Sequence, residues 1–150
     1  MKSTSPLDTL IERSRDARDR AGQALAQDRR TEQLTARQLD TLQDYRREYH
    51  RRLHAALTAG MNVGEINNYR RFMQSLDIAI GNADVRLRQD NNKVTASQRL
   101  WRARQQQLSS YDTLAGRRAA QEQVREARQE QRRSDEATTN TQARQRSRNP

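Results

Sequence analysis

The stretch Ala59-Gly60-Met61-Asn62-Val63-Gly64 is the one place in the interior of the chain where helix-breaking residues gather. Gly60 suits the position just after a helix, because glycine adopts a left-handed backbone without strain. Asn62 suits the N-cap of a following helix, and Glu65 three residues later completes a pair resembling a capping box. The stretch therefore predicts a loop over residues 59–64 between two helices.

The residues before this loop have the composition of one long helix. They run for roughly 50 residues without proline and are rich in Ala, Leu, Arg, Gln and Glu, which are strong helix formers. Ser5-Pro6 suits a helix start, since proline is tolerated in the first turn. We expect a first helix over about residues 6–58. The short loop makes the next helix antiparallel to it, so the numbers of facing residues should add up to about 123.

After the loop, a regular row of positions in steps of three and four predicts a second helix over about residues 65–133. Twelve of the 15 positions in this row are apolar, although only 32% of the chain is hydrophobic. Such a repeat over about seven heptads is typical of a coiled coil with a partner helix. The row consists of Ile66, Tyr69, Met73, Leu76, Ile80, Ala83, Leu87, Asp90, Val94, Ser97, Trp101, Arg104, Leu108, Tyr111 and Ala115.

The first helix has a less regular pattern, divided between two neighbouring registers. One register contains Leu7, Leu10, Ala17, Ala21, Ala24, Leu42, Tyr45, Tyr49 and Ala56. The other contains Ile11, Leu25, Leu39 and Leu53. The middle of the seam is polar, at Asp28, Thr31, Thr35 and Gln38, so we expect weaker packing there.

The composition supports a thin helical structure rather than a compact globule. Of 150 residues, 32% are hydrophobic and 4% aromatic, whereas globular domains are typically about 45–50% apolar. A coiled coil needs only one buried stripe per helix. The fold class that we predict is all-α: a long antiparallel two-helix coiled coil, or helical hairpin, over residues 1–136. A disordered basic tail over residues 137–150 is expected to follow it.

Several function classes find no support in the sequence. There is no cysteine, no long apolar run and no apolar leader after Met1, so we expect a soluble cytoplasmic protein without membrane insertion. No glycine-rich phosphate loop is present, and a two-helix coiled coil offers no concave pocket for a nucleophile and its base. We therefore predict no enzymatic activity, no catalytic residue and no cofactor.

Two histidines raise the possibility of a metal site. His50 and His54 lie four residues apart and could bind zinc with Glu48 or a residue of the other helix. The arginines that flank them repel a cation and favour surface histidines.

The net charge of +10 allows a nucleic-acid-binding coiled coil as an alternative. However, acidic residues are interleaved with arginines over most of the chain, so nucleic acid is not the partner we expect.

The loop-proximal third of the predicted hairpin gathers aromatic residues. Tyr45 and Tyr49 should face the second helix near Leu76 and Met73, and Phe72 and Ala79 lie one residue off the seam. Extra apolar side chains at the edge of a two-helix seam are left partly exposed. With the nearby arginines at 46, 47, 70 and 71, they suit a protein-binding surface. The residues alone equally allow rings that widen the core to hold the tip rigid.

The same residues resemble the FliJ family of flagellar export proteins. The motifs are Gln38-Leu39-x-x-Leu42-x-x-Tyr45-Arg46-x-Glu48-Tyr49-x-x-x-Leu53, Gly60, and Asn68-Tyr69-x-x-Phe72-x-x-x-Leu76-x-x-Ala79-Ile80. Leu7-x-x-Leu10, Leu25-Ala26 with Arg29-Arg30, and Trp101 also fit. The similarity covers about residues 5–125.

The resemblance implies a role in flagellar type III protein export. Members of the family resemble the central stalk of rotary ATPases, stand in the export ATPase hexamer, engage the export gate membrane protein FlhA and handle export chaperones. It also implies a cytoplasmic protein peripherally associated with the inner membrane at the flagellar base. The stalk protein of a virulence type III secretion system is an alternative that the residues do not separate from this one.

The resemblance also implies binding residues. The gate-binding face would consist of Gln38, Leu42, Tyr45, Tyr49, Phe72, Leu76 and Ala79. Ala83, on the same face, is small and apolar where relatives can present a polar or basic side chain, so that part of the contact would differ. By analogy with stalk subunits, the end that enters the ATPase ring would carry Leu10, Arg13, Arg20, Leu100, Trp101 and Arg104.

Overall fold

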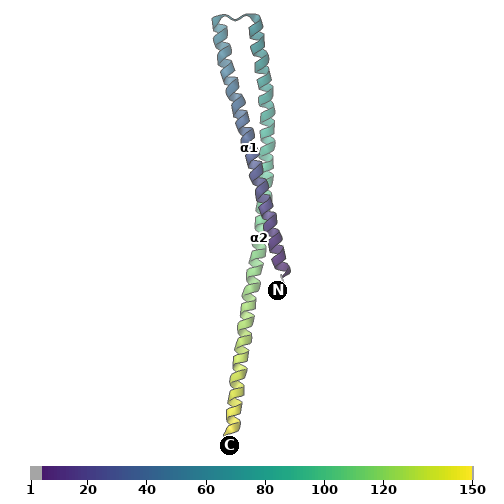
Figure 1. The fold of residues 1–150 in the computed structure, drawn as a ribbon, viewed down its shortest axis with the longest axis vertical. Coiled ribbons are helices and arrows are strands. Elements are labelled where there is room, and N and C mark those ends of the chain that lie inside the picture. The colour runs from purple at the N-terminus through teal and green to yellow at the C-terminus, as the bar shows by residue number, and fades with distance from the viewer. Residues whose placement is uncertain (1–4, 150) are drawn as a thin grey trace. The chain divides into compact units, whose positions relative to one another are not determined.

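The structure, a computed structural model, describes residues 5–149 and contains two α-helices in that part of the chain. Helix α1 spans Pro6–Ala59 and helix α2 spans Val63–Arg148 (Figure 1). The two helices pack against each other, which confirms the predicted all-α, antiparallel two-helix fold. The loop is shorter than expected, because Ala59 still belongs to α1 and Val63 already belongs to α2.

Local side chains define the helix ends. At the start of α1, the backbone N–H of Asp8 donates to Ser5 Oγ over 3.2 Å, and the N–H of Ser5 donates to Asp8 Oδ2 over 3.3 Å. These reciprocal bonds satisfy N–H groups that have no partner within the helix. Gly60 ends α1 with a φ of 86°, and Asn62 Oδ1 accepts the N–H of Glu65 over 2.9 Å. Both roles expected from the loop sequence are confirmed.

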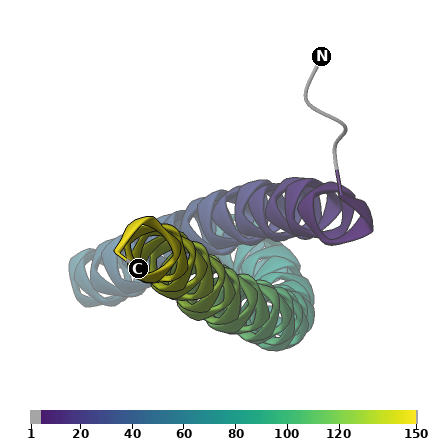
Figure 2. The same cartoon turned by 90° about the horizontal axis from the view of Figure 1, so that it is seen from below.

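The chain divides into two compact units, and residues 16–105 form the first. It is a hairpin in which α1 and α2 run side by side from the loop, as Figures 1 and 2 show. Its register follows from cross-helix contacts: Thr35 meets Asp90, Arg46 meets Asp77, and Tyr49 meets Phe72. The numbers of these pairs add up to about 121–125, close to the expected value of about 123.

The seam of α1 combines the two registers found in the sequence. Ala21 and Leu42 from one register alternate with Leu25 and Leu39 from the other, and all four are buried or half-buried. By contrast, Tyr45 is 54% exposed. The seam thus takes the residues of the first register that lie seven apart from Leu7 and alternates them with the second register, while Leu10 and Tyr45 lie off the seam.

Two hydrogen bonds join the helices at the polar middle of this seam. The hydroxyl of Thr35 donates to Asp90 Oδ2 over 2.6 Å, and the hydroxyl of Ser97 donates to Asp28 Oδ2. Thr35 and Asp90 are only 4% and 6% exposed. The region is polar, as expected, but its buried groups are satisfied, and no buried side-chain nitrogen or oxygen among the described residues lacks a partner.

The second unit combines the described residues up to residue 15 with those from residue 106 onward. Leu7, Ser14 and Leu108 are its buried residues, with Leu108 only 2% exposed. Ile11, Tyr111 and Ala115 are half-buried, and every described residue after Ala115 is exposed. Within the part of the chain that the structure describes, the last part of α2 therefore has no partner helix.

The C-terminal segment differs from the expected disordered tail over residues 137–150 as far as residue 149, and Pro150 lies outside the described residues. Helix α2 does not end near residue 133 but continues to Arg148. No glycine or proline interrupts residues 117–149, and the segment is rich in Ala, Gln and Arg, which favour helix. The hydroxyls of Thr138, Thr139 and Thr141 donate to backbone carbonyls four residues earlier, so these side chains are satisfied within the helix.

Candidate functional site

An aromatic cluster lies near the hairpin loop, within the unit of residues 16–105. The ring centroids of Tyr49 and Phe72 are 4.2 Å apart, with a tilt of 37° between the ring planes. Tyr69 approaches Tyr49 from the same helix as Phe72, at a centroid distance of 6.3 Å. The guanidinium carbon of Arg52 lies 5.5 Å from the centroid of Tyr49, within the range of a cation–π contact. These contacts fix the rings relative to one another across the two helices.

The cluster is not enclosed by its own chain. Phe72 is 41% exposed, whereas Tyr49 and Tyr69 are half-buried, and Tyr45, four residues before Tyr49 on α1, adds a further ring that is 54% exposed. Rigid aromatic side chains with an exposed edge lose little side-chain entropy on binding, which is why such residues carry much of the binding energy at protein interfaces. The cluster is therefore suited to contact another protein.

Beside the rings, farther from the loop, an open groove of about 570 Å³ runs between the helices. Three residues of the expected face, Gln38, Leu42 and Ala79, line it. Its other lining residues are Leu34, Arg37, Thr41, Asn82, Ala83 and Arg86. Leu76 is 7% exposed and lies in the seam, so it can support this face only from beneath.

Most of the groove was not found from the sequence. Leu34, Arg37 and Arg86 do not belong to the heptad rows, and a groove depends on how the two helices are placed. The sequence does contain one indication of the groove. A second stripe beside the α1 seam has the three- and four-residue spacing of one helix face, and it consists of Leu34, Gln38, Thr41 and Tyr45.

The basic rim of the ring cluster is partly neutralised by carboxylates. Arg46 pairs with Asp77 across the helices at 2.8 Å. Arg51 and Arg52 both pair with Glu48 on α1, at 2.6 Å and 3.3 Å. Arg47 pairs with Asp44 at 3.5 Å. The carboxylate of Glu48 is thus bound to arginines beside His50. Across residues 5–149, no three His, Cys, Asp or Glu side chains gather in a way that could hold a metal ion.

The residues expected at the ATPase-ring end are distributed over both units of the chain. Leu10 and Leu100 are 43% and 48% exposed, and Arg13, Arg20 and Arg104 are also exposed.

Trp101 differs from the other residues expected at that end, because it is half-buried in the seam. A Cβ atom added at Gly22 would lie 3.3 Å from Trp101 Nε1. The absence of a side chain at Gly22 thus lets the indole pack against α1. Trp101 therefore contributes to packing within the hairpin as well as to the surface.

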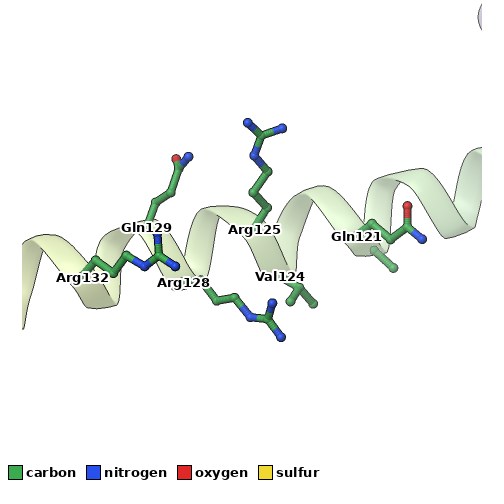
Figure 3. Close-up of a pocket in the computed structure, with 7 residues that line it drawn as sticks. Gln121, Val124, Arg125, Arg128, Gln129 and Arg132 are labelled. Atoms are coloured by element: carbon green, nitrogen blue, oxygen red, sulfur yellow. The ribbon is translucent and has the colours of Figure 1, made fainter.

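A second hollow, of about 650 Å³, lies on the unpartnered part of α2 (Figure 3). It is lined by residues of this one helix, with Val124 beside Arg125, Arg128 and Arg132. A single helix cannot exclude water from a bound molecule, so this hollow lacks the character of a ligand pocket.

Neither helix, over the residues that the structure describes, has a segment long and apolar enough to cross a membrane.

Comparisons with known proteins agree with this arrangement. The sequence model of the family described as "Flagellar FliJ protein" matches residues 2–147. The Flagellar FliJ proteins of Salmonella typhi and Escherichia coli K12 are each 30% identical to the chain over 136 residues, covering 91% of this chain and 92% of theirs. In fold, the chain is similar to CT670 from Chlamydia trachomatis, a proposed YscO homolog. The TM-score is 0.54 and the identity 18%, over 95% of this chain and 93% of that one. The family match over almost the whole sequence, together with the two-helix fold, shows that the chain belongs to the flagellar FliJ protein family.

Proposed function

We propose that this chain is a soluble, cytoplasmic component of the flagellar type III export apparatus that acts by binding rather than by catalysis. In this role it stands as a central stalk in the export ATPase ring and couples the ring to the export gate protein FlhA. It also handles export chaperones and associates peripherally with the inner membrane at the flagellar base. Family membership supports the general role, and the finer roles are the proposal.

The observation that carries the proposal is the partly exposed aromatic cluster near the loop. Tyr45 and Phe72 are 54% and 41% exposed, so neither ring is enclosed in the core of the hairpin. The hairpin holds Phe72 in place by its ring contact with Tyr49 at 4.2 Å. An exposed ring that is held in place, with the exposed Tyr45 on the facing helix and an open groove nearby, favours a gate-binding surface over extra core.

The stalk role is supported by surface charge. The chain carries a net charge of +10, and Arg13, Arg20 and Arg104 are exposed. A basic surface attracts acidic groups at a distance without fixing one orientation, which suits a stalk that contacts several equivalent subunits in turn.

The proposal is tested with the double variant Tyr45→Ala/Phe72→Ala and purified, detergent-solubilised FlhA. We expect binding to weaken by at least about tenfold in biolayer interferometry, because exposed aromatic anchors dominate interface energies. The helical circular dichroism signal should stay unchanged, since both rings are more than one third exposed and contribute little to the core.

Two controls sharpen this test. Ile78→Ala/Val85→Ala removes side chains that are 61% and 53% exposed elsewhere on α2, and it should bind like the unaltered chain. Arg13→Ala/Arg20→Ala should keep gate binding but stimulate the export ATPase less. Unchanged gate binding by the Tyr45/Phe72 variant would contradict the proposal. So would competition by duplex DNA with FlhA, which would instead favour binding dominated by phosphate contacts.

A further inference from the structure

The groove beside the ring cluster extends the candidate face away from the loop, and its chemistry differs from that of the rings. Leu34, Leu42, Ala79 and Ala83 supply apolar groups from both helices. Leu34 is 58% exposed, so this apolar surface is accessible. At about 570 Å³, the groove has the size of a typical binding pocket, roughly 300–1,000 Å³. It is open along the hairpin, however, and thus suits a chain segment better than a small molecule.

The charged residues of the groove have one sign. Arg37 on α1 and Arg86 on α2 both line it, and no Asp or Glu does. Neither arginine makes an ion pair or a hydrogen bond with the described residues of the chain. By contrast, Arg46, Arg47, Arg51, Arg52 and Arg88 elsewhere on the hairpin each pair with a carboxylate. The groove therefore carries two uncompensated cations, one on each helix.

We infer that this groove binds an amphipathic segment of the partner protein, whose apolar side chains enter between the helices and whose carboxylates meet Arg37 and Arg86. Guanidinium groups bind carboxylates through paired hydrogen bonds, so two of them specify acidic groups at defined positions. The inference rests on the proposed function, because it assigns the partner segment that continues from the ring cluster. It adds Leu34, Arg37 and Arg86 to the docking surface.

The test compares charge-reversal variants for binding to purified, detergent-solubilised FlhA. Arg37→Glu/Arg86→Glu places two like charges opposite the expected carboxylates, and affinity should fall by at least about tenfold. The matched control Arg29→Glu/Arg99→Glu makes the same change in net charge at two exposed arginines of the same helices outside the groove. Its affinity should stay within about twofold, because exposed charges away from a contact are largely screened by salt.

A photo-cross-linking residue identifies the occupant directly. Asn82→benzoylphenylalanine places the reactive group at an exposed position of the groove lining. We expect the cross-linked FlhA peptide, identified by mass spectrometry, to carry Asp or Glu within one helical turn of apolar residues. A cross-linked peptide without carboxylates, or a cross-link to a second copy of the chain, would overturn the inference.

The variants separate the inference from the function on which it rests. If Tyr45→Ala/Phe72→Ala loses binding while Arg37→Glu/Arg86→Glu binds like the unaltered chain, the groove is not part of the docking surface and the gate-binding role stands. If the unaltered chain does not bind FlhA, or the Tyr45/Phe72 variant binds equally well, the proposed function fails and the inference fails with it.

Discussion

At the scale of single residues, Asp90 is the most unusual member of the seam. It is a carboxylate that is 6% exposed between two helices, and its partner is the hydroxyl of Thr35. A buried polar group costs free energy unless it is hydrogen-bonded. A shift of the helices along each other would leave both groups without partners, so the pair favours the observed register over neighbouring ones.

The contribution of this pair can be measured with Thr35→Val, which keeps the shape of the side chain and removes the donor. We expect the free energy of unfolding to fall by about 1–3 kcal/mol, because the carboxylate of Asp90 is left buried without its hydrogen bond. Urea denaturation followed by circular dichroism gives the value. Thr31→Val changes an exposed threonine one turn away and should stay within about 0.5 kcal/mol of the unaltered chain. Equal stability of the two variants would contradict a structural role for the bond.

The polar middle of the first helix was predictable as a region but not residue by residue. Asp28, Thr31, Thr35 and Gln38 form one polar run in the sequence, and the structure divides it. Asp28 and Thr35 lie in the seam, whereas Thr31 and Gln38 are exposed. Polar residues give no hydrophobic signal to choose between rows, so only the positions of their partners on α2 decide which of them is buried.

At the scale of helices, the ends were predictable because their signals are local. Gly60 and Asn62 act within a few residues of chain, and the structure places them as expected. The seam of α1 was harder to predict, since it takes residues from both registers and leaves others, such as Leu10 and Tyr45, exposed. The extent of α2 beyond residue 133 was missed because its many charged and polar residues resemble a solvated tail. A helix of strong helix formers can continue there without a partner.

Replacing glycine by alanine should have opposite effects on stability at two positions, Gly60 and Gly81. Gly60→Ala places a Cβ on a residue with a φ of 86° at the end of α1, which should cost about 1 kcal/mol. Gly81→Ala adds a methyl group in the exposed interior of α2, where no side chain lies within 4 Å, and should add about 1 kcal/mol of stability. Urea denaturation of both variants under one set of conditions tests the pair. A stabilising Gly60→Ala would show that the loop adopts another backbone in solution.

At the scale of the molecule, the sequence indicated the aromatic face but not the groove beside it. The rings could be placed together because antiparallel pairing follows from a short loop. The groove depends on the distance between the helices and on residues that lie off both seams. Arg37 and Arg86 are far apart in sequence and share one hollow only after the helices have paired.

The pairing of the helices predicts how the hairpin responds to shortening. Residues 29–35 of α1 lie opposite residues 90–96 of α2, since Asp28 bonds with Ser97 and Thr35 with Asp90. Deleting both heptads removes facing segments and should preserve a cooperatively unfolding hairpin. Deleting residues 29–35 alone shifts the part of α1 before residue 29 by one heptad relative to α2. This single deletion should lower the melting temperature more than the double deletion does, as measured by circular dichroism. The opposite ranking would show that the register is not fixed along the stem.

The hydrogen bond between Thr35 and Asp90 thus constrains how hairpins of this kind can change in sequence during evolution. Exposed side chains outside the docking surface can be exchanged with little effect on the fold, which agrees with the 30% identity over 136 residues between this chain and relatives of similar length. Insertions and deletions are more constrained, because they shift one helix along the other. An insertion or deletion in α1 must be matched by one of equal length in α2, and its length must be a multiple of seven residues to keep the seam. In related hairpins, the segments before and after Gly60 should therefore lengthen or shorten by the same number of residues, while the amino-acid sequence diverges.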